Sequence, residues 1–88
     1  MKVEYLEKFS RDLNKITDKK VKASVSQIIE ELKVAPSPDQ IRNLKKLHGV
    51  KNAYRIRTGD YRIGIFIEQD KIELARIANR KEIYRLFP

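Results

Sequence analysis

The sequence predicts an α+β fold in the order βααβββ: an antiparallel sheet with a two-helix hairpin packed on one face and a short C-terminal tail. Three observations lead to this prediction. The first half carries two apolar stripes of helical period, the second half carries three segments in which polar and apolar residues alternate, and no linker or repeat divides them. With 88 residues the chain has room for one core, so residues 1–88 are expected to form a single domain.

A short strand and two helices are expected in the N-terminal half. Residues 2–6 alternate weakly between polar and apolar side chains, which suggests a strand. Residues 9–16 place apolar side chains at i, i+4 and i+7, the spacing of one helix face. Asp18 can cap a second helix, and Pro36 is expected to end it at about Val34. The apolar positions are Phe9, Leu13 and Ile16 in the first helix, and Val21, Val25, Ile28, Ile29 and Leu32 in the second.

The C-terminal half is expected to supply the sheet that covers these helices. After a polar link over residues 37–51, strands are predicted at residues 53–57, 61–68 and 72–78, with a hairpin turn between the first two. Side chains alternate between the two faces of a strand, so an inward set fixes an outward set. The predicted inward side chains include Tyr54, Ile56, Tyr61 and Ile63, and the outward ones include Arg55, Arg57 and Arg62.

Composition narrows the classes of function. The chain has no cysteine and one histidine, His48, which excludes a disulfide scaffold, a structural zinc cluster and a thiol nucleophile. We therefore expect neither a metal nor a cofactor. No apolar run approaches the ~18–20 residues that span a bilayer, and residues 1–6 lack the apolar core of a signal peptide. A cytoplasmic location without membrane association is expected.

The positive charge is concentrated in the second half of the chain. Of the net charge of +8, residues 1–40 contribute +1, from eight Lys or Arg against seven Asp or Glu. Residues 41–88 contribute +7, from twelve against five. A concentrated positive field attracts polyanions, which favours a nucleic-acid partner. A solvated surface that keeps the protein soluble is the alternative interpretation.

Three arginines are expected to converge on the exposed face of the sheet. Arg55 and Arg57 share a face of one strand, and Arg62 follows across the hairpin on the same face. A guanidinium group binds phosphate bidentately through a rigid fork and stays protonated near neutral pH, so the cluster indicates an anion site. Ordinary exposed surface is again the alternative interpretation.

The C-terminal residues add a second cluster. Residues 79–85 are expected to form one helical turn, in which Arg80 and Tyr84 are four residues apart and share a side. Neighbouring guanidinium groups stabilise a phenolate, which makes Tyr84 a candidate general base, and a tyrosine can also stack on a nucleobase. Alternatively, the Tyr84 ring packs on the sheet edge beside Leu86 and Phe87.

These segments carry a resemblance to a known family. Residues 54–63, Tyr-Arg-Ile-Arg-Thr-Gly-Asp-Tyr-Arg-Ile, resemble the central hairpin of the RelE/ParE superfamily of toxins, and residues 79–84, Asn-Arg-Lys-Glu-Ile-Tyr, resemble its basic tail. Residues 44–49 are similar to the segment before this hairpin, and the likeness covers essentially the whole chain. The resemblance implies the toxin of a type II toxin–antitoxin pair, a metal-independent endoribonuclease that cleaves messenger RNA, usually in the decoding A site of the ribosome.

The resemblance also implies roles for the site residues. Arg55, Arg57 and Arg62 would hold the scissile phosphate. Arg80 would do the same or protonate the leaving oxygen. Tyr84 would orient the nucleotide or help to activate the 2′-hydroxyl group that attacks phosphorus. Further RNA contacts are expected from Lys45, Lys46, Lys51, Lys81 and Arg85.

The general base is where the sequence departs from the family pattern. Many relatives have histidine where Asn79 stands, and some have lysine in place of the first two arginines of the hairpin. A guanidinium group is a poor proton acceptor, so Lys81 and Tyr84 are the first candidates for the base. His48 lies in the link before the hairpin and is expected to be incidental.

The partners implied by the resemblance are messenger RNA, the ribosome and a small RelB-like antitoxin. A partly disordered, often acidic segment of such an antitoxin would fold along the basic face and neutralise it. Two alternatives stay open. One is a ParE-like toxin that inhibits DNA gyrase without cleaving nucleic acid, and the other is an inactive RNA-binding module of the same fold.

Overall fold

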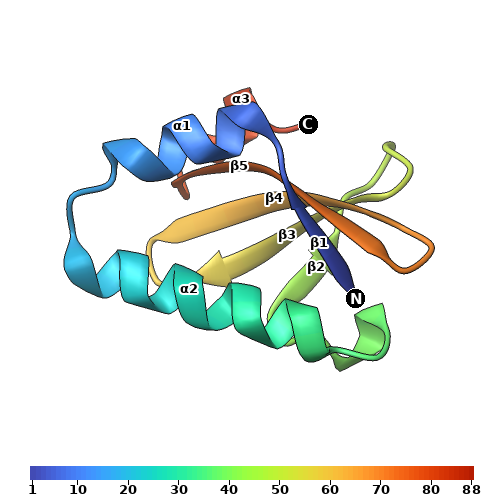
Figure 1. Cartoon of the computed structure of the whole chain (residues 1–88). Helices are drawn as coiled ribbons and strands as arrows, with labels where there is room; N and C mark the ends of the chain where they lie inside the picture. The colour runs from blue at the N-terminus through green and yellow to red at the C-terminus, as the bar shows by residue number, and fades with distance from the viewer.

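The chain adopts the order βααββββα in a computed structural model, which describes residues 1–88. Two long helices follow a short first strand, and four strands and a short helix come after them (Figure 1). The predicted α+β class, both helices and all four predicted strands are confirmed. The bounds are β1 Lys2–Tyr5, α1 Glu7–Lys15, α2 Lys19–Val34, the 3₁₀ helix η1 Pro38–Gln40, β2 Leu44–Lys46, β3 Ala53–Thr58, β4 Tyr61–Glu68, β5 Lys71–Asn79 and α3 Ile83–Leu86.

Several of the free backbone groups at both ends of α2 have hydrogen-bond partners. At the start, the Asp18 carboxylate accepts hydrogen bonds from the backbone N–H groups of Lys20 and Val21, at 2.8 and 3.4 Å, as the sequence predicts for a cap. At the other end, the N-terminal ammonium group of Met1 donates to three backbone carbonyl groups at 3.0–3.2 Å, those of Leu32, Lys33 and Ala35. A cation at this end also complements the helix dipole.

The sheet has five strands in the order β1-β5-β4-β3-β2 and is mixed rather than fully antiparallel. β1 pairs with β5 in parallel, with Val3 opposite Ile72, while every other pair is antiparallel. The prediction of an antiparallel sheet is therefore wrong at β1. Alternation along a strand shows which side chains share a face, but it carries no information on the partner or its direction.

The segment predicted as a polar link contains regular structure. Within residues 37–51 lie η1 and β2, and β2 pairs with β3 so that Lys45 is opposite Arg55. Asn43, with a φ of 60°, turns the chain into β2. A strand of three residues is too short to show a period of two, so its sequence gave no signal of pairing.

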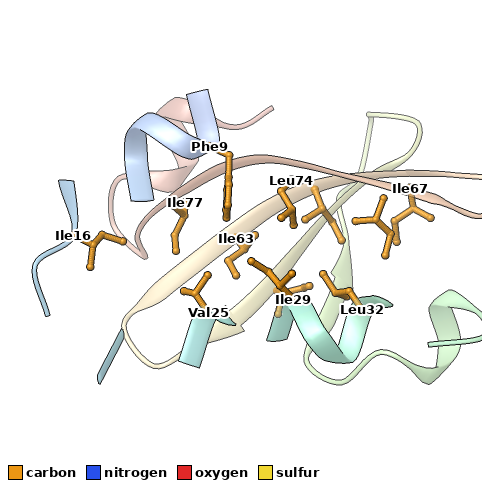
Figure 2. Close-up of a cluster of buried hydrophobic side chains, with 12 residues drawn as sticks. Phe9, Ile16, Val25, Ile29, Leu32, Ile63, Ile67, Leu74 and Ile77 are labelled. Carbon is orange, nitrogen blue, oxygen red and sulfur yellow. The ribbon is translucent and has the colours of Figure 1, made fainter. Parts of the chain in front are cut away.

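The main core fills the space between the sheet and the two long helices. Figure 2 shows Phe9 of α1 and Val25, Ile29 and Leu32 of α2 pointing toward the strands. The facing side chains of β4 and β5 are almost completely buried. They include Ile63, Ile65 and Ile67 of β4, and Ile72, Leu74 and Ile77 of β5.

The opposite face of the sheet is only partly covered, and we refer to it as the open face. A second cluster of buried side chains lies there, in which Ile83 and Phe87 of the C-terminal segment pack on Ala53, Ala75 and Ala78 of the strands. The sheet thus lies between α2 on one side and α3 on the other, with α1 across β5 (Figure 1). No helix in the chain is long and apolar enough to cross a membrane.

Candidate functional site

The pairing of β3 with β4 brings the three arginines of the hairpin together. Arg57 and Arg62 are direct cross-strand partners, and Arg55 is opposite Gly64, two residues along the same face. The buried side chains between them, Ile56 and Ile63, face the helices. The register therefore has the arginines on the open face, as the alternation predicts.

The guanidinium group of Arg62 is held in place by the hairpin turn. Its Nη1 atom donates to the backbone carbonyl groups of Gly59 and Tyr61, both at 2.9 Å. These neutral acceptors orient the group and leave its charge uncompensated. The turn that joins the strands thus also orients one cation of the cluster.

The arginines of the cluster form no ion pair with a carboxylate group. None of Arg55, Arg57, Arg62 and Arg80 makes a salt bridge, whereas Arg76 in β5 does. Arg76 donates to both carboxylate oxygens of Asp12 in α1, at 2.7 and 3.1 Å. This hydrogen bond raises the pKa of Arg76. Arg76 is therefore held by Asp12 of α1. The four arginines of the cluster have no carboxylate partner and remain free to bind an anion.

Tyr84 lies over Arg55 rather than in the core. The Cζ atom of Arg55 is 4.5 Å from the centroid of the Tyr84 ring, which is a cation–π contact. Tyr84 is 70% exposed, while its neighbour Ile83 and the nearby Phe87 are buried. The apolar residues of the tail therefore anchor it, and the tyrosine is presented to solvent beside the arginines.

These residues line one concavity of about 370 Å³ on the open face. This volume lies in the range of about 300–1,000 Å³ found for ligand sites. No carboxylate lines it, so its electrostatic potential is set by cations and it favours an anionic ligand. We call it the tyrosine cavity, and its lining residues are Asn43, Leu44, Lys45, Arg55, Arg57, Arg62 and Tyr84.

A second concavity of about 750 Å³ adjoins the first between α2 and the end of the hairpin. It shares Asn43, Arg57 and Arg62 with the tyrosine cavity, and it is lined by Arg80 but not by Tyr84. Arg80 therefore joins the cluster, but not through a shared helical turn. α3 begins only at Ile83, so Arg80 lies in the preceding turn, and it lines this second concavity together with Arg57 and Arg62.

Most of the additional RNA-binding residues predicted from the sequence lie outside both concavities. Lys45 lines the tyrosine cavity, but Lys46 points to the other face of β2, where its ammonium group is 5.1 Å from the ring centroid of Tyr54. Arg85 lies 3.9 Å from the Glu82 carboxylate. The remaining predicted residues, Lys51 and Lys81, and also His48, are exposed in turns and line neither concavity.

Sequence reasoning missed three residues that shape the site. Asn43 and Leu44 line the tyrosine cavity because β2 brings them beside β3, and β2 itself was not predicted. Gly64 faces the same side as the arginines and leaves room there. The alternation predicts that Gly64 lies on the outward face. It does not predict which residue packs into the space that Gly64 leaves, because that depends on where the C-terminal segment lies. No group of three or more His, Cys, Asp or Glu side chains that could hold a metal ion occurs in the chain.

Comparisons with known proteins agree with this geometry. The family model described as the ParE toxin of the type II toxin–antitoxin system, parDE, matches residues 3–84. The chain is 38% identical over 89 residues to toxin RelE3 of Methanocaldococcus jannaschii, with 100% of both chains covered. It is 30% identical over 81 residues to putative toxin RelE1 of the same organism, covering 91% of this chain and 89% of that protein.

A solved structure shows the same fold. The RelB–RelE antitoxin–toxin complex from Methanococcus jannaschii contains a chain that matches with a TM-score of 0.82 and 35% sequence identity. The match covers 97% of this chain and 99% of that chain. The similarity therefore extends over nearly the whole chain.

Proposed function

The chain belongs to the RelE/ParE superfamily of type II toxin–antitoxin toxins, and from this premise we propose that it is a metal-independent endoribonuclease that cleaves messenger RNA. The observation that carries the proposal is the tyrosine cavity. Three guanidinium groups without carboxylate partners and one exposed phenol meet there. This set of groups suits a phosphodiester flanked by a nucleobase.

In the proposed reaction, the 2′-hydroxyl group of a ribose attacks the adjacent phosphorus atom. A bond forms between O2′ and phosphorus, and the bond from phosphorus to the 5′ oxygen of the next nucleotide breaks. The products are a 2′,3′-cyclic phosphate and a 5′-hydroxyl end. One proton leaves the attacking hydroxyl group and another reaches the leaving oxygen, so the site needs a proton acceptor and a proton donor.

The arginines fit the charge requirement of this reaction. Arg55, Arg57 and Arg62 would hold the scissile phosphate and stabilise the extra negative charge of the transition state. These cations would supply the electrostatic role that a metal ion has in other nucleases. Arg80, which lines the second concavity together with Arg57 and Arg62, would bind the neighbouring phosphate or protonate the leaving oxygen.

Tyr84 is the residue we propose for the nucleotide side of the scissile bond. Its exposed ring over Arg55 can stack on a base, and its phenol oxygen can orient the 2′-hydroxyl group or take its proton. The other candidate base, Lys81, does not line the cavity, which favours Tyr84.

The proposed partners are messenger RNA in the ribosomal A site and a RelB-like antitoxin. The solved relative is a complex of RelB with RelE, which supports an antitoxin for this chain as well. The net charge of +8 favours both RNA and an acidic antitoxin segment. Coexpression with the small protein encoded beside this chain should yield a stable complex. Recovery of a free, non-toxic monomer would contradict this assignment.

A second candidate is a ParE-like inhibitor of DNA gyrase, which is favoured by the ParE description of the matching family model. Such a protein would bind without cleaving and would not need the complete set of arginines and tyrosine. A supercoiling assay with purified gyrase separates the two functions. Inhibition of supercoiling together with intact transcripts would support the second candidate.

The test of the proposed nuclease is induced expression followed by mapping of messenger RNA ends. Wild-type protein should produce new 5′-hydroxyl ends within codons, and Arg62→Ala should lower their yield by about 10²–10³-fold, the usual loss for one transition-state donor. The matched control is Arg11→Ala, which removes an exposed arginine paired with Glu7 on α1. Growth arrest with intact transcripts, or equal cleavage by Arg62→Ala and wild type, would contradict the proposal.

A further inference from the structure

Gly64 lies on the open face in a cross-strand row whose other residues are lysine or arginine. The cross-strand row through it runs from Lys45 in β2 to Arg55, then Gly64, then Arg76 in β5. Gly64 lies inside β4 without a positive φ, and the pairing of β4 with β5 has a register irregularity between Gly64 and Ile65. Glycine in the middle of a strand is unfavourable in itself and often marks a bulge or a close approach by another group. At Gly64 a close approach accompanies the irregularity.

The group that approaches is the ring of Phe87 in the C-terminal segment. A methyl carbon added at Gly64 would lie 2.8 Å or less from three atoms of this ring, Cγ, Cδ1 and Cδ2. Phe87 is 4% exposed, and its ring centroid is 5.0 Å from that of Phe66 on the same face. Phe87 therefore occupies the space that a side chain at position 64 would need, and a Cβ atom there would clash with its ring.

Tyr84 is held in position by the segment that Phe87 anchors. Gly64 and Arg55 are neighbours across β4 and β3, about 4.8 Å apart in the hydrogen-bonding direction. Phe87 lies on Gly64, and Tyr84 lies on Arg55. The backbone N–H of Phe87 donates to the carbonyl group of Ile83 at 2.9 Å and closes the single turn that carries Tyr84.

Tyr84 has little else to fix it. Its hydroxyl group makes no hydrogen bond within the chain, and 70% of the residue is exposed. Ile83 and Phe87 are the buried residues of the C-terminal segment that pack on the sheet, and the partly buried Leu86 packs against the same cluster. The place of the phenol over Arg55 thus depends on these anchors.

We propose that Gly64 is a positioning residue of the RNA site, because its missing side chain lets Phe87 dock and thereby fixes Tyr84 over Arg55. The positioning of Tyr84 by Gly64 and Phe87 does not depend on the function of the protein, whereas the consequence for RNA cleavage rests on the proposed function. We expect a Cβ atom at position 64 to displace Phe87 rather than β4, since β4 is hydrogen-bonded to a strand on each side and Phe87 lies in a segment outside the sheet.

The test compares Gly64→Ala, Phe87→Ala, the double variant and Tyr84→Ala in the full-length protein. The position of Tyr84 is measured by the nuclear Overhauser effect between its ring protons and the side-chain methylene protons of Arg55. RNA cleavage is measured in parallel as single-turnover rate and as KM. The control for general destabilisation is Ile72→Val, which removes one methylene group from the main core away from the tail.

Both Gly64→Ala and Phe87→Ala should lose the Tyr84–Arg55 Overhauser effect and lower the cleavage rate at least ten-fold, toward that of Tyr84→Ala. The double variant should be no worse than either single one, because both changes remove one contact. Ile72→Val should keep the Overhauser effect and the rate.

Retention of the Overhauser effect in Gly64→Ala, or multiplication of the two losses in the double variant, would overturn the proposal. If the wild-type protein cleaves no RNA, the proposed function fails, and the Overhauser measurement still decides whether Gly64 positions Tyr84. If Gly64→Ala does not fold, Phe87→Ala tests the same contact from the other side.

Discussion

Replacing Asp12 by alanine should destabilise the fold strongly without touching the tyrosine cavity. Asp12 accepts two hydrogen bonds from the Arg76 guanidinium and a third from the backbone N–H of Ile77, at 2.7, 3.1 and 3.1 Å. Its side chain is 11% exposed and that of Arg76 is 19% exposed. The substitution would leave a largely buried cation and a backbone donor without their partner.

The expected loss in the free energy of unfolding is about 3 kcal/mol. Removing one partner of a buried ion pair costs about 3–5 kcal/mol, and the remaining exposure of Asp12 and Arg76 brings the value to the lower end. For a domain of this size, that corresponds to a fall in Tm of roughly 12–24 °C. The raised pKa of Arg76 keeps the guanidinium charged, so on the basic side this contribution is lost only at strongly alkaline pH.

Thermal and urea unfolding, followed by circular dichroism, measure this effect. The double variant Asp12→Ala/Arg76→Ala should be less destabilised than the sum of the two single variants, because it leaves no unpaired charge. Arg11→Ala, which breaks an exposed pair with Glu7, should change stability by less than about 0.5 kcal/mol. Loss of under 1 kcal/mol in Asp12→Ala, or strict additivity in the double variant, would show that the Asp12–Arg76 pair does not stabilise the fold in this way.

Three further predictions follow from the geometry. Asp18→Ala should lower the free energy of unfolding by about 1 kcal/mol in urea titrations, because two N–H groups of α2 lose their acceptor. Arg80→Ala should reduce RNA cleavage, while Lys46→Ala, on the other face of β2, should leave it unchanged in the same assay. The Ser37 hydroxyl group, and next the backbone N–H of Asp39, hold the pKa of the Asp39 carboxyl below its usual range. Ser37→Ala should therefore raise that pKa in an NMR titration, and the ionised form then gives way to the protonated form at higher pH than in wild type.

Much of the fold could be predicted from local patterns. The cap at Asp18, the stop before Pro36 and the alternation through the hairpin are local signals, and each marks a feature that the structure contains. The same alternation put three arginines on one face, because a period of two allows no other arrangement. Which face of its strand a side chain occupies can thus largely be predicted from the sequence.

The features that could not be predicted depend on contacts between distant segments. The parallel pairing of β1, the short strand β2 and the contact between Phe87 and Gly64 each join residues far apart in the chain. Lys46 was grouped with the RNA-binding residues by charge alone, and only the pairing of β2 shows that it faces the helix side. Arg76 differs from the free arginines only through Asp12, 64 residues away.

We propose that the arginines of the tyrosine cavity bind the phosphate of RNA. This binding is tested most directly by titrating the purified protein with a short RNA whose 2′-hydroxyl groups are methylated, while observing the arginine side-chain N–H signals by NMR. The signals of Arg55, Arg57 and Arg62 should shift together with one dissociation constant, and that of Arg76 should stay in place. Shifts confined to arginines outside the cavity, or equal shifts at Arg76, would contradict the account.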